Sequence, residues 1–267
     1  MNQVCHRIKR YTSDLSDAQW EKVRELLPLE RRGPGRPIEI DMREAVNAMA
    51  YINKTGCQWE NLPGEFPNYQ SVYYHYRKWC LDGTWEQVNR ALIYEARHGL
   101  GRCPYPSAAV MDSQSVKTTE VGGECGYDAG KKVKGRKRHI LVDTLGHLVK
   151  VVVHPANIQD RDGAKLLLQA LPAMLRLRLL KIWADGGYRG SLIDWCWQEM
   201  KTVLEVVSPP PSQKGFAVLP RRWVVERTFA WLGHYRRLSK DYEECLRSSE
   251  GMIYLASIHS LLKRLSG

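Results

Sequence analysis

The chain has 267 residues, of which 43% are hydrophobic and 26% charged, and its formal net charge is +11. This composition is that of a globular protein and excludes wholesale disorder. Most of the positive excess lies after residue 105, which favours an anionic partner such as nucleic acid over the alternative of a solvated basic surface without a partner.

The seven cysteines form no CxxC pair, so we expect reduced thiols and neither a disulfide scaffold nor a zinc module. The N-terminal segment lacks the apolar core of a signal peptide. No stretch is long and uncharged enough to span a membrane. We therefore expect a cytoplasmic, nucleoid-associated protein with no membrane partner.

Residues 1–97 are predicted to form a small all-α domain. Four helices are expected, and their starts are marked by capping residues: Ser16, Asp41, Asn68 and Thr84. Gly56 is a plausible end for the second helix. Residues 98–107 hold two glycines and two prolines and are predicted to be a linker.

The third helix of this domain resembles the second helix of a helix-turn-helix. Helical spacing turns Val72, Tyr76 and Trp79 inward. The outward set can contact base edges and phosphates together: Gln70, Ser71, Tyr73, Tyr74, Arg77 and Lys78. A solvated helix face beside an aromatic core is the alternative interpretation.

Residues 108–267 alternate between strand and helix patterns. Strands are expected at 108–117, 136–143, 147–155, 179–185 and 202–208, and helices at 160–175, 191–200, 221–235 and 249–265. Three strands, helix, strand, helix, strand, helix is the order of a ribonuclease H-like domain. The predicted fold is therefore α/β, with a mixed-sheet ribonuclease H-like domain behind the helical one.

Three acidic residues are the candidate catalytic and metal-binding groups: Asp112, Asp185 and Glu226. In the predicted order the first and fourth strands are neighbours, so the two aspartates can converge, and the helix after the fifth strand brings the glutamate to them. Mg²⁺ or Mn²⁺ prefers such oxygen ligands, and two ions suit an in-line phosphoryl displacement. Separately, the three acids could be a strand end, a turn residue and one half of a surface ion pair with Arg222.

A basic segment at residues 131–138 carries six positive side chains: Lys131, Lys132, Lys134, Arg136, Lys137 and Arg138. Near an acidic triad we expect this segment to contact DNA phosphates, so that DNA binding weakens steeply with salt. A solvated hairpin is the alternative interpretation.

Several segments together resemble the DDE transposases of bacterial insertion sequences, in the insertion sequence 4/5 superfamily. The matching segments cover nearly the whole chain and include LSDAQWEKVRELLP, MDSQSVKT, GKKVKGRKRHILVDTLG, ADGGYRG and RRWVVERTFAWL. The resemblance implies a ribonuclease H-like catalytic domain, a helical DNA-binding domain, and Mg²⁺ at Asp112, Asp185 and Glu226. Arg222 fits the family signature around the glutamate, whereas Leu219 and Gly233 replace its tyrosine and its final basic residue.

The resulting hypothesis is a transposase that binds the terminal inverted repeats of its element, cleaves the DNA ends and joins the 3′-hydroxyl to target DNA. Its expected partner is double-stranded DNA, and we expect a homodimer when the protein is assembled on DNA. Two alternatives remain at this stage: a DNA-binding regulator without catalysis, and a nuclease without strand transfer.

Overall fold

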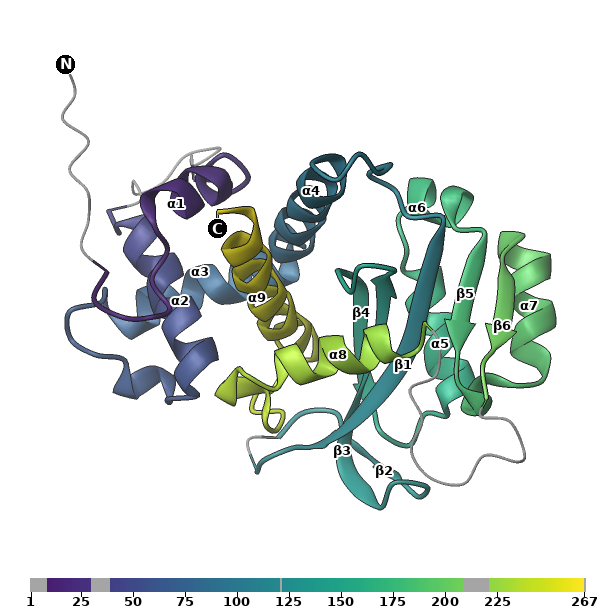
Figure 1. Cartoon of the computed structure of the whole chain (residues 1–267). Helices are drawn as coiled ribbons and strands as arrows, with labels where there is room; N and C mark the ends of the chain where they lie inside the picture. The colour runs from purple at the N-terminus through teal and green to yellow at the C-terminus, as the bar shows by residue number, and fades with distance from the viewer. Residues whose placement is uncertain (1–8, 30–38, 121, 209–220, 267) are drawn as a thin grey trace.

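The structure is a computed structural model that describes residues 9–29, 39–120, 122–208 and 221–266. The chain runs through a group of helices and then a mixed sheet with its own helices, and its last helix returns to the first group (Figure 1). In these ranges no helix has the length and apolar character needed to cross a membrane.

The N-terminal group consists of α1 (Asp17–Arg24), α2 (Met42–Thr55), the 3-10 turn η1 (Trp59–Asn61), α3 (Tyr69–Leu81) and α4 (Thr84–His98). The predicted capping box is present, because Ser16 accepts from the Gln19 N–H while the Gln19 side chain accepts from the Ser16 N–H. Gly56 ends α2 in the left-handed conformation, with φ of 76°. Thr84 was predicted to be a cap, but it lies inside α4, and Gly83 is the N-cap.

The sheet contains β1 (Ala108–Lys117), β2 (Gly126–Asp128), β3 (Val133–Asp143), β4 (Leu148–Pro155), β5 (Lys181–Ala184) and β6 (Val203–Val206). β3 is antiparallel to β1 and to β4, whereas β1, β5 and β6 run parallel to one another. This is the predicted ribonuclease H-like arrangement. The three-residue β2 was not predicted, because its glycine-rich surroundings read as a loop.

One face of the sheet is covered by α5 (Asp160–Gln169), α6 (Ala173–Arg178) and α7 (Ser191–Met200), with the 3-10 turn η2 (Gly186–Tyr188) before α7. A single helix was predicted at residues 160–175. The structure breaks it, because Pro172 has no N–H to continue the helix and instead stands at the N-cap of α6.

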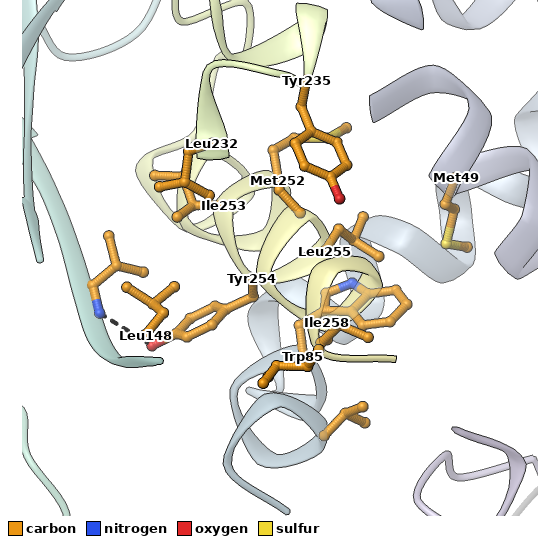
Figure 2. Close-up of a cluster of buried hydrophobic side chains, with 14 of the residues drawn as sticks. Met49, Trp85, Leu148, Leu232, Tyr235, Met252, Ile253, Tyr254, Leu255 and Ile258 are labelled. Atoms are coloured by element: carbon orange, nitrogen blue, oxygen red, sulfur yellow. Dashed lines mark hydrogen bonds between the residues drawn. The ribbon is translucent and has the colours of Figure 1, made fainter. Parts of the chain in front are cut away.

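The other face is covered by α8 (Trp223–Leu232), the 3-10 turn η3 (Arg236–Leu238) and α9 (Leu246–Leu265). α9 is buried on nearly every side and contacts α2, α3, α4 and β4. Figure 2 shows its side chains between Met49 and Trp85 of the N-terminal helices and Leu148 of the sheet. Tyr254 accepts a hydrogen bond from the Val151 N–H on β4, at 3.4 Å.

The hydrophobic core therefore crosses the predicted boundary between the two domains. A continuous cluster of buried side chains runs from Leu15 and Val23 in the N-terminal helices to Ile258 and Leu262 in α9. A buried ion pair of 2.5 Å between Arg97 and Asp143 also joins α4 to the end of β3. The linker at 98–107 remains a prediction, but the helices before it share their core with the C-terminal helix.

Candidate active site

Asp112 on β1 lies at the same level as Asp185, which directly follows the neighbouring strand β5 in extended conformation. Val110 on β1 is paired in parallel register with Trp183 on β5, and each aspartate comes two residues after its member of that pair. Since side chains alternate between the two faces of a strand, both carboxylates lie on the face where Val110 and Trp183 are packed, which is the face of α8. Adjacent strands are about 4.8 Å apart, so the predicted convergence of the two aspartates is a direct result of this register.

Glu226 lies in the first turn of α8, the helix that packs on β1 and β3 across this face (Figure 1). Its side chain is 49% exposed, and the Arg222 side chain bridges it to Asp112. Arg222 Nη2 is 3.9 Å from Asp112 Oδ2 and 3.4 Å from Glu226 Oε1. Arg222, which is also among the predicted site residues, thus links Glu226 to Asp112.

Burial and the nearby charge of Asp185 raise the pKa of Asp112 to about 6, although the Ser113 N–H and Arg222 act in the opposite direction. The side chain of Asp112 is 17% exposed. A carboxylate desolvated beside a second carboxylate is a common feature of acidic sites that await a cation.

The donor chemistry of the three acids fits a hard divalent cation, because all their ligand atoms are carboxylate oxygens. In the described part of the chain, however, no three His, Cys, Asp or Glu side chains are already close enough together to hold a metal ion. The guanidinium of Arg222 instead contacts both Asp112 and Glu226. Glu226 would have to leave Arg222 to join the two aspartates.

A fourth acid near the site was missed by sequence reasoning. Asp160, in the first turn of α5, accepts a hydrogen bond of 3.0 Å from Ser113 Oγ and pairs with Lys137 Nζ at 2.9 Å. Lys131 Nζ donates to the Ser113 carbonyl at 3.2 Å. A helix N-terminus directly after a buried strand was the available signal, but it gives no hint that Asp160 meets Ser113, the neighbour of Asp112.

An open cleft of about 420 Å³ lies beside the turn that follows Asp185. Its lining includes Asp160, Arg161, Gly186, Gly187 and Arg189. The cleft therefore adjoins the carboxyl end of β5, where ligands bind in many sheets of parallel strands. Its two arginines make the rim suitable for an anion.

The basic segment is divided along its length, into an exposed first part and a buried second part within β3. Lys131, Lys132 and Lys134 are exposed, whereas Arg136, Lys137 and Arg138 are buried. Arg136 donates to Asp241 and to the carbonyls of Glu243 and Glu244, and Arg138 donates to the carbonyls of Leu238 and Lys240.

The expectation of phosphate contacts is therefore corrected for Arg136, Lys137 and Arg138. The two arginines lie on the α8–α9 face of β3 and hold the segment between these helices, while Lys137 lies on the opposite face with Asp128 and Asp160. Arg136 and Lys137 are paired with acids, whereas Arg138 donates only to two carbonyls and its buried Nε has no hydrogen-bond partner among the residues that the structure describes. Lys131, Lys132 and Lys134 remain candidates for DNA contacts.

The third helix has the predicted orientation. Val72, Tyr76 and Trp79 are buried. Of the predicted outward set, the exposed side chains are Gln70, Ser71, Tyr74, Arg77 and Lys78, and Tyr73 is half-buried. Tyr74 is 63% exposed, which is unusual for a large aromatic side chain without a partner surface. This face is accessible to a ligand, and its contact with DNA stays a prediction.

Comparison with known proteins places these features in a family. The family described as "Transposase DDE domain" matches residues 105–261. The chain belongs to the DDE transposases. A second family, described as "Putative transposase of IS4/5 family", matches residues 15–89 of this DDE transposase. The resemblance expected from the sequence and the ribonuclease H-like fold are thereby confirmed.

Two relatives of this DDE transposase are proteins of an insertion element. A putative transposase for insertion sequence element IS402 of Burkholderia cepacia is 32% identical over 120 residues, which are 41% of this chain and 54% of that protein. An uncharacterized 16.2 kDa protein of IS402 is 27% identical over 118 residues, or 42% of this chain and 78% of its own length. The match thus spans about half of the IS402 transposase. No solved structure matches this DDE transposase.

Of the two residues that depart from the family signature, Leu219 and Gly233, the structure describes only Gly233. Leu219 lies outside the described residues. Gly233 is the C-cap of α8, where its N–H donates to the Phe229 carbonyl at 2.9 Å. It thus ends the helix at the position where other DDE transposases carry a basic side chain.

Proposed function

We propose that this protein is an active transposase that binds the terminal inverted repeats of its insertion sequence, cleaves the DNA there and joins the freed 3′-hydroxyl to target DNA. The observation that carries the proposal is the position of Asp112 and Asp185 on one face at one level of the sheet, beneath the helix that carries Glu226. Paired carboxylates in this arrangement suit a two-metal phosphoryl transfer.

Asp112, Asp185 and Glu226 would hold the divalent ions, Mg²⁺ or Mn²⁺. When bound, such ions lower the pKa of the attacking water or hydroxyl and stabilise the leaving oxygen. The chain itself supplies the positions of the acids and a cation, Arg222, that neutralises Asp112 and Glu226 in their absence. Once released from these acids, Arg222 can contact a DNA phosphate.

DNA would be bound by two exposed sets of side chains. Gln70, Ser71, Tyr74, Arg77 and Lys78 of α3 would contact the terminal repeats, and Lys131, Lys132 and Lys134 would contact the backbone near the acids. Lys131 supports this second role, because its Nζ already lies on Ser113, next to Asp112. We also propose that two copies assemble on DNA, which sedimentation of the protein with and without end DNA can test.

The test is to incubate the purified protein with labelled DNA of the element ends and a target plasmid, with and without Mg²⁺. The proposal requires that the DNA is cut at the element ends and joined covalently to the plasmid when Mg²⁺ is present, and that neither reaction occurs without Mg²⁺. Cutting without joining would show a nuclease, and specific binding without cutting would show a DNA-binding regulator. Asp185→Asn serves as the matched control, because the amide keeps the shape of the side chain and removes its charge.

A further inference from the structure

A buried chain of hydrogen bonds lies on the face of the sheet opposite to the acids. Tyr188 Oη is 2.8 Å from His139 Nε2, His139 Nδ1 is 2.9 Å from His154 Nε2, and His154 Nδ1 is 2.9 Å from the Pro155 carbonyl. Tyr188, His139 and His154 are each at most 2% exposed. They come from η2, β3 and β4, so the chain joins three elements that are distant in the sequence.

The donor at every step of this chain is determined by its last member. The Pro155 carbonyl can only accept, so His154 Nδ1 carries a proton and His154 Nε2 is an acceptor. His139 Nδ1 must then donate to His154, which leaves His139 Nε2 to accept from the Tyr188 hydroxyl. Burial lowers the pKa of His139 to about 3 and also lowers the pKa of His154, which agrees with two neutral rings.

Helix α5 closes over the two histidines with a glycine. A Cβ on Gly163 would lie 2.4 Å from His154 Nε2 and 2.6 Å from His139 Nδ1, so no larger residue fits between the helix and the rings. The rings themselves are stacked, with centroids 5.1 Å apart and an interplanar angle of 25°. The pair is therefore packed closely from above and cannot easily change its orientation.

The hydrogen-bonded chain from Tyr188 to His154 is connected to Asp185 through one short turn of the backbone. Tyr188 N–H donates to the Asp185 carbonyl at 3.2 Å, and Gly187 N–H donates to Asp185 Oδ1 at 2.8 Å. Asp185 lies on the α8 face of the sheet, whereas Tyr188 is buried among the side chains of the α5–α7 face. The backbone passes around the end of β5 between them, so fixing Tyr188 fixes the turn that presents the Asp185 carboxylate.

We propose that Tyr188, His139 and His154 are positioning residues that anchor the turn after Asp185 and thereby hold this carboxylate beside Asp112 for divalent-cation binding. The inference rests on the proposed function in that Asp185 is taken as a metal ligand. None of the three side chains touches the metal or the DNA. They act on Asp185 through the backbone of Gly186 and Gly187.

A second tyrosine–histidine pair elsewhere in the protein offers a matched control for this proposal. Tyr235 is also buried, and its hydroxyl lies 3.1 Å from His259 Nδ1, in a second tyrosine–histidine pair near the junction of α8 and α9. Tyr188→Phe and Tyr235→Phe therefore delete the same hydroxyl from the same kind of pair. The first variant alone should affect the turn after Asp185.

The first measurement is hydrogen exchange in the metal-free full chain. Tyr188→Phe should accelerate exchange of the Gly187 and Tyr188 amides at least tenfold, whereas Tyr235→Phe should leave both amides unchanged. If Tyr188→Phe does not fold, His154→Leu replaces it, because this change removes the acceptor of His139 and leaves Tyr188 in place. Unchanged protection of both amides in the folded variant would overturn the proposed anchor.

The second measurement is calorimetric titration with Mn²⁺ alone. Removing a group that orients a metal ligand typically lowers affinity about 10- to 100-fold, so Tyr188→Phe should bind Mn²⁺ at least tenfold more weakly than wild type and Tyr235→Phe. Equal affinity in all three proteins would overturn the positioning role. If wild type itself binds no Mn²⁺, the proposed function fails, and the exchange result still decides whether Tyr188 anchors the turn.

Discussion

The guanidinium of Arg222 lies 3.9 Å from the carboxylate of Asp112, although the two residues belong to different elements more than a hundred positions apart. The same guanidinium is 3.4 Å from Glu226. One cation thus partly neutralises two acids from β1 and α8. Arg222 therefore links a carboxylate of the sheet to a carboxylate of the helix that covers it.

Arg222→Gln should shift the pH dependence of cleavage. Arg222 lowers the pKa of Asp112, which lies at about 6, so its removal raises that pKa further. Ionised Asp112 is the form that binds a cation, and the acidic limb of the pH–rate profile should therefore move to higher pH. Arg24→Gln, an exposed change on α1, is the control and should leave the profile unchanged. An unchanged acidic limb in Arg222→Gln would contradict the role given to this arginine.

Asp112→Asn should abolish cleavage and yet stabilise the metal-free protein. Folding raises the pKa of Asp112 from its ordinary 3.8 to about 6, so ionisation of this carboxyl lowers the free energy of unfolding in full above about pH 6, and this loss disappears below about pH 3. The amide removes this cost, and denaturant unfolding at pH 7 should show a gain of up to about 3 kcal/mol.

The pH dependence provides the internal control for this variant. At about pH 2.5 wild type and Asp112→Asn should unfold at the same denaturant concentration, because the wild-type carboxyl is then protonated in both the folded and the unfolded state. Mg²⁺ should stabilise wild type but not the variant at pH 7. Equal stability of the two proteins at pH 7 without metal would show that Asp112 is not held in a strained, charged state.

The two halves of the basic segment should respond differently to alanine. Changing Lys131, Lys132 and Lys134 should weaken binding to every DNA sequence and flatten the plot of log affinity against log salt by about one unit for each lost phosphate contact. Changing Arg136 alone should instead lower the melting temperature, because five protein acceptors lose their donor. If the three lysine changes leave the slope of log affinity against log salt unchanged, these lysines do not contact phosphate.

The exposed face of α3 should determine the preference for element ends. Tyr74→Ala with Arg77→Ala should weaken binding to end DNA about tenfold or more, with little change in melting temperature because both side chains are exposed. Tyr76→Phe is the control variant, because it changes a buried side chain of the same helix. It removes a buried hydrogen bond of 2.5 Å to the Ser248 carbonyl and should lower stability without changing the preference. Equal loss for end DNA and scrambled DNA in the double variant would exclude base reading by α3.

A fragment that ends at residue 97 should not fold by itself. Its helices bury Met49, Trp85 and Leu92 in the same cluster as Ile253 and Ile258 of α9, so the fragment would expose this surface to water. Circular dichroism should show reduced helicity and no cooperative thermal transition. Cooperative unfolding of the fragment would show that the N-terminal helices form an independent domain.

Local signals in the sequence predicted much of this fold, and long-range contacts explain what they missed. The capping box at Ser16 and Gln19 and the buried face of α3 depend on neighbouring residues, so spacing alone located them. The burial of Arg136 depends on Asp241 and Glu244, which are more than a hundred residues away. A basic run looks the same in a sequence whether it faces solvent or a buried acid.

In the candidate site, too, some features could be predicted from the sequence, whereas others depend on long-range contacts. Strand order predicted that Asp112 and Asp185 would converge, because the first and fourth strands are neighbours in this fold. The contact of Ser113 with Asp160 and the chain from Tyr188 to His154 could not be predicted, since they depend on which face of β3, β4 and α5 each side chain occupies.

The most direct test of the central claim is to map the bound metal on the protein itself. Fe²⁺ that replaces Mg²⁺ generates hydroxyl radicals in the presence of ascorbate and peroxide, and these cleave the polypeptide near the ion. We predict cleavage close to residues 112, 185 and 226 in wild type, suppressed by excess Mg²⁺ and lost in Asp185→Asn. Cleavage elsewhere, or the same pattern in wild type and Asp185→Asn, would contradict a metal site formed by Asp112, Asp185 and Glu226.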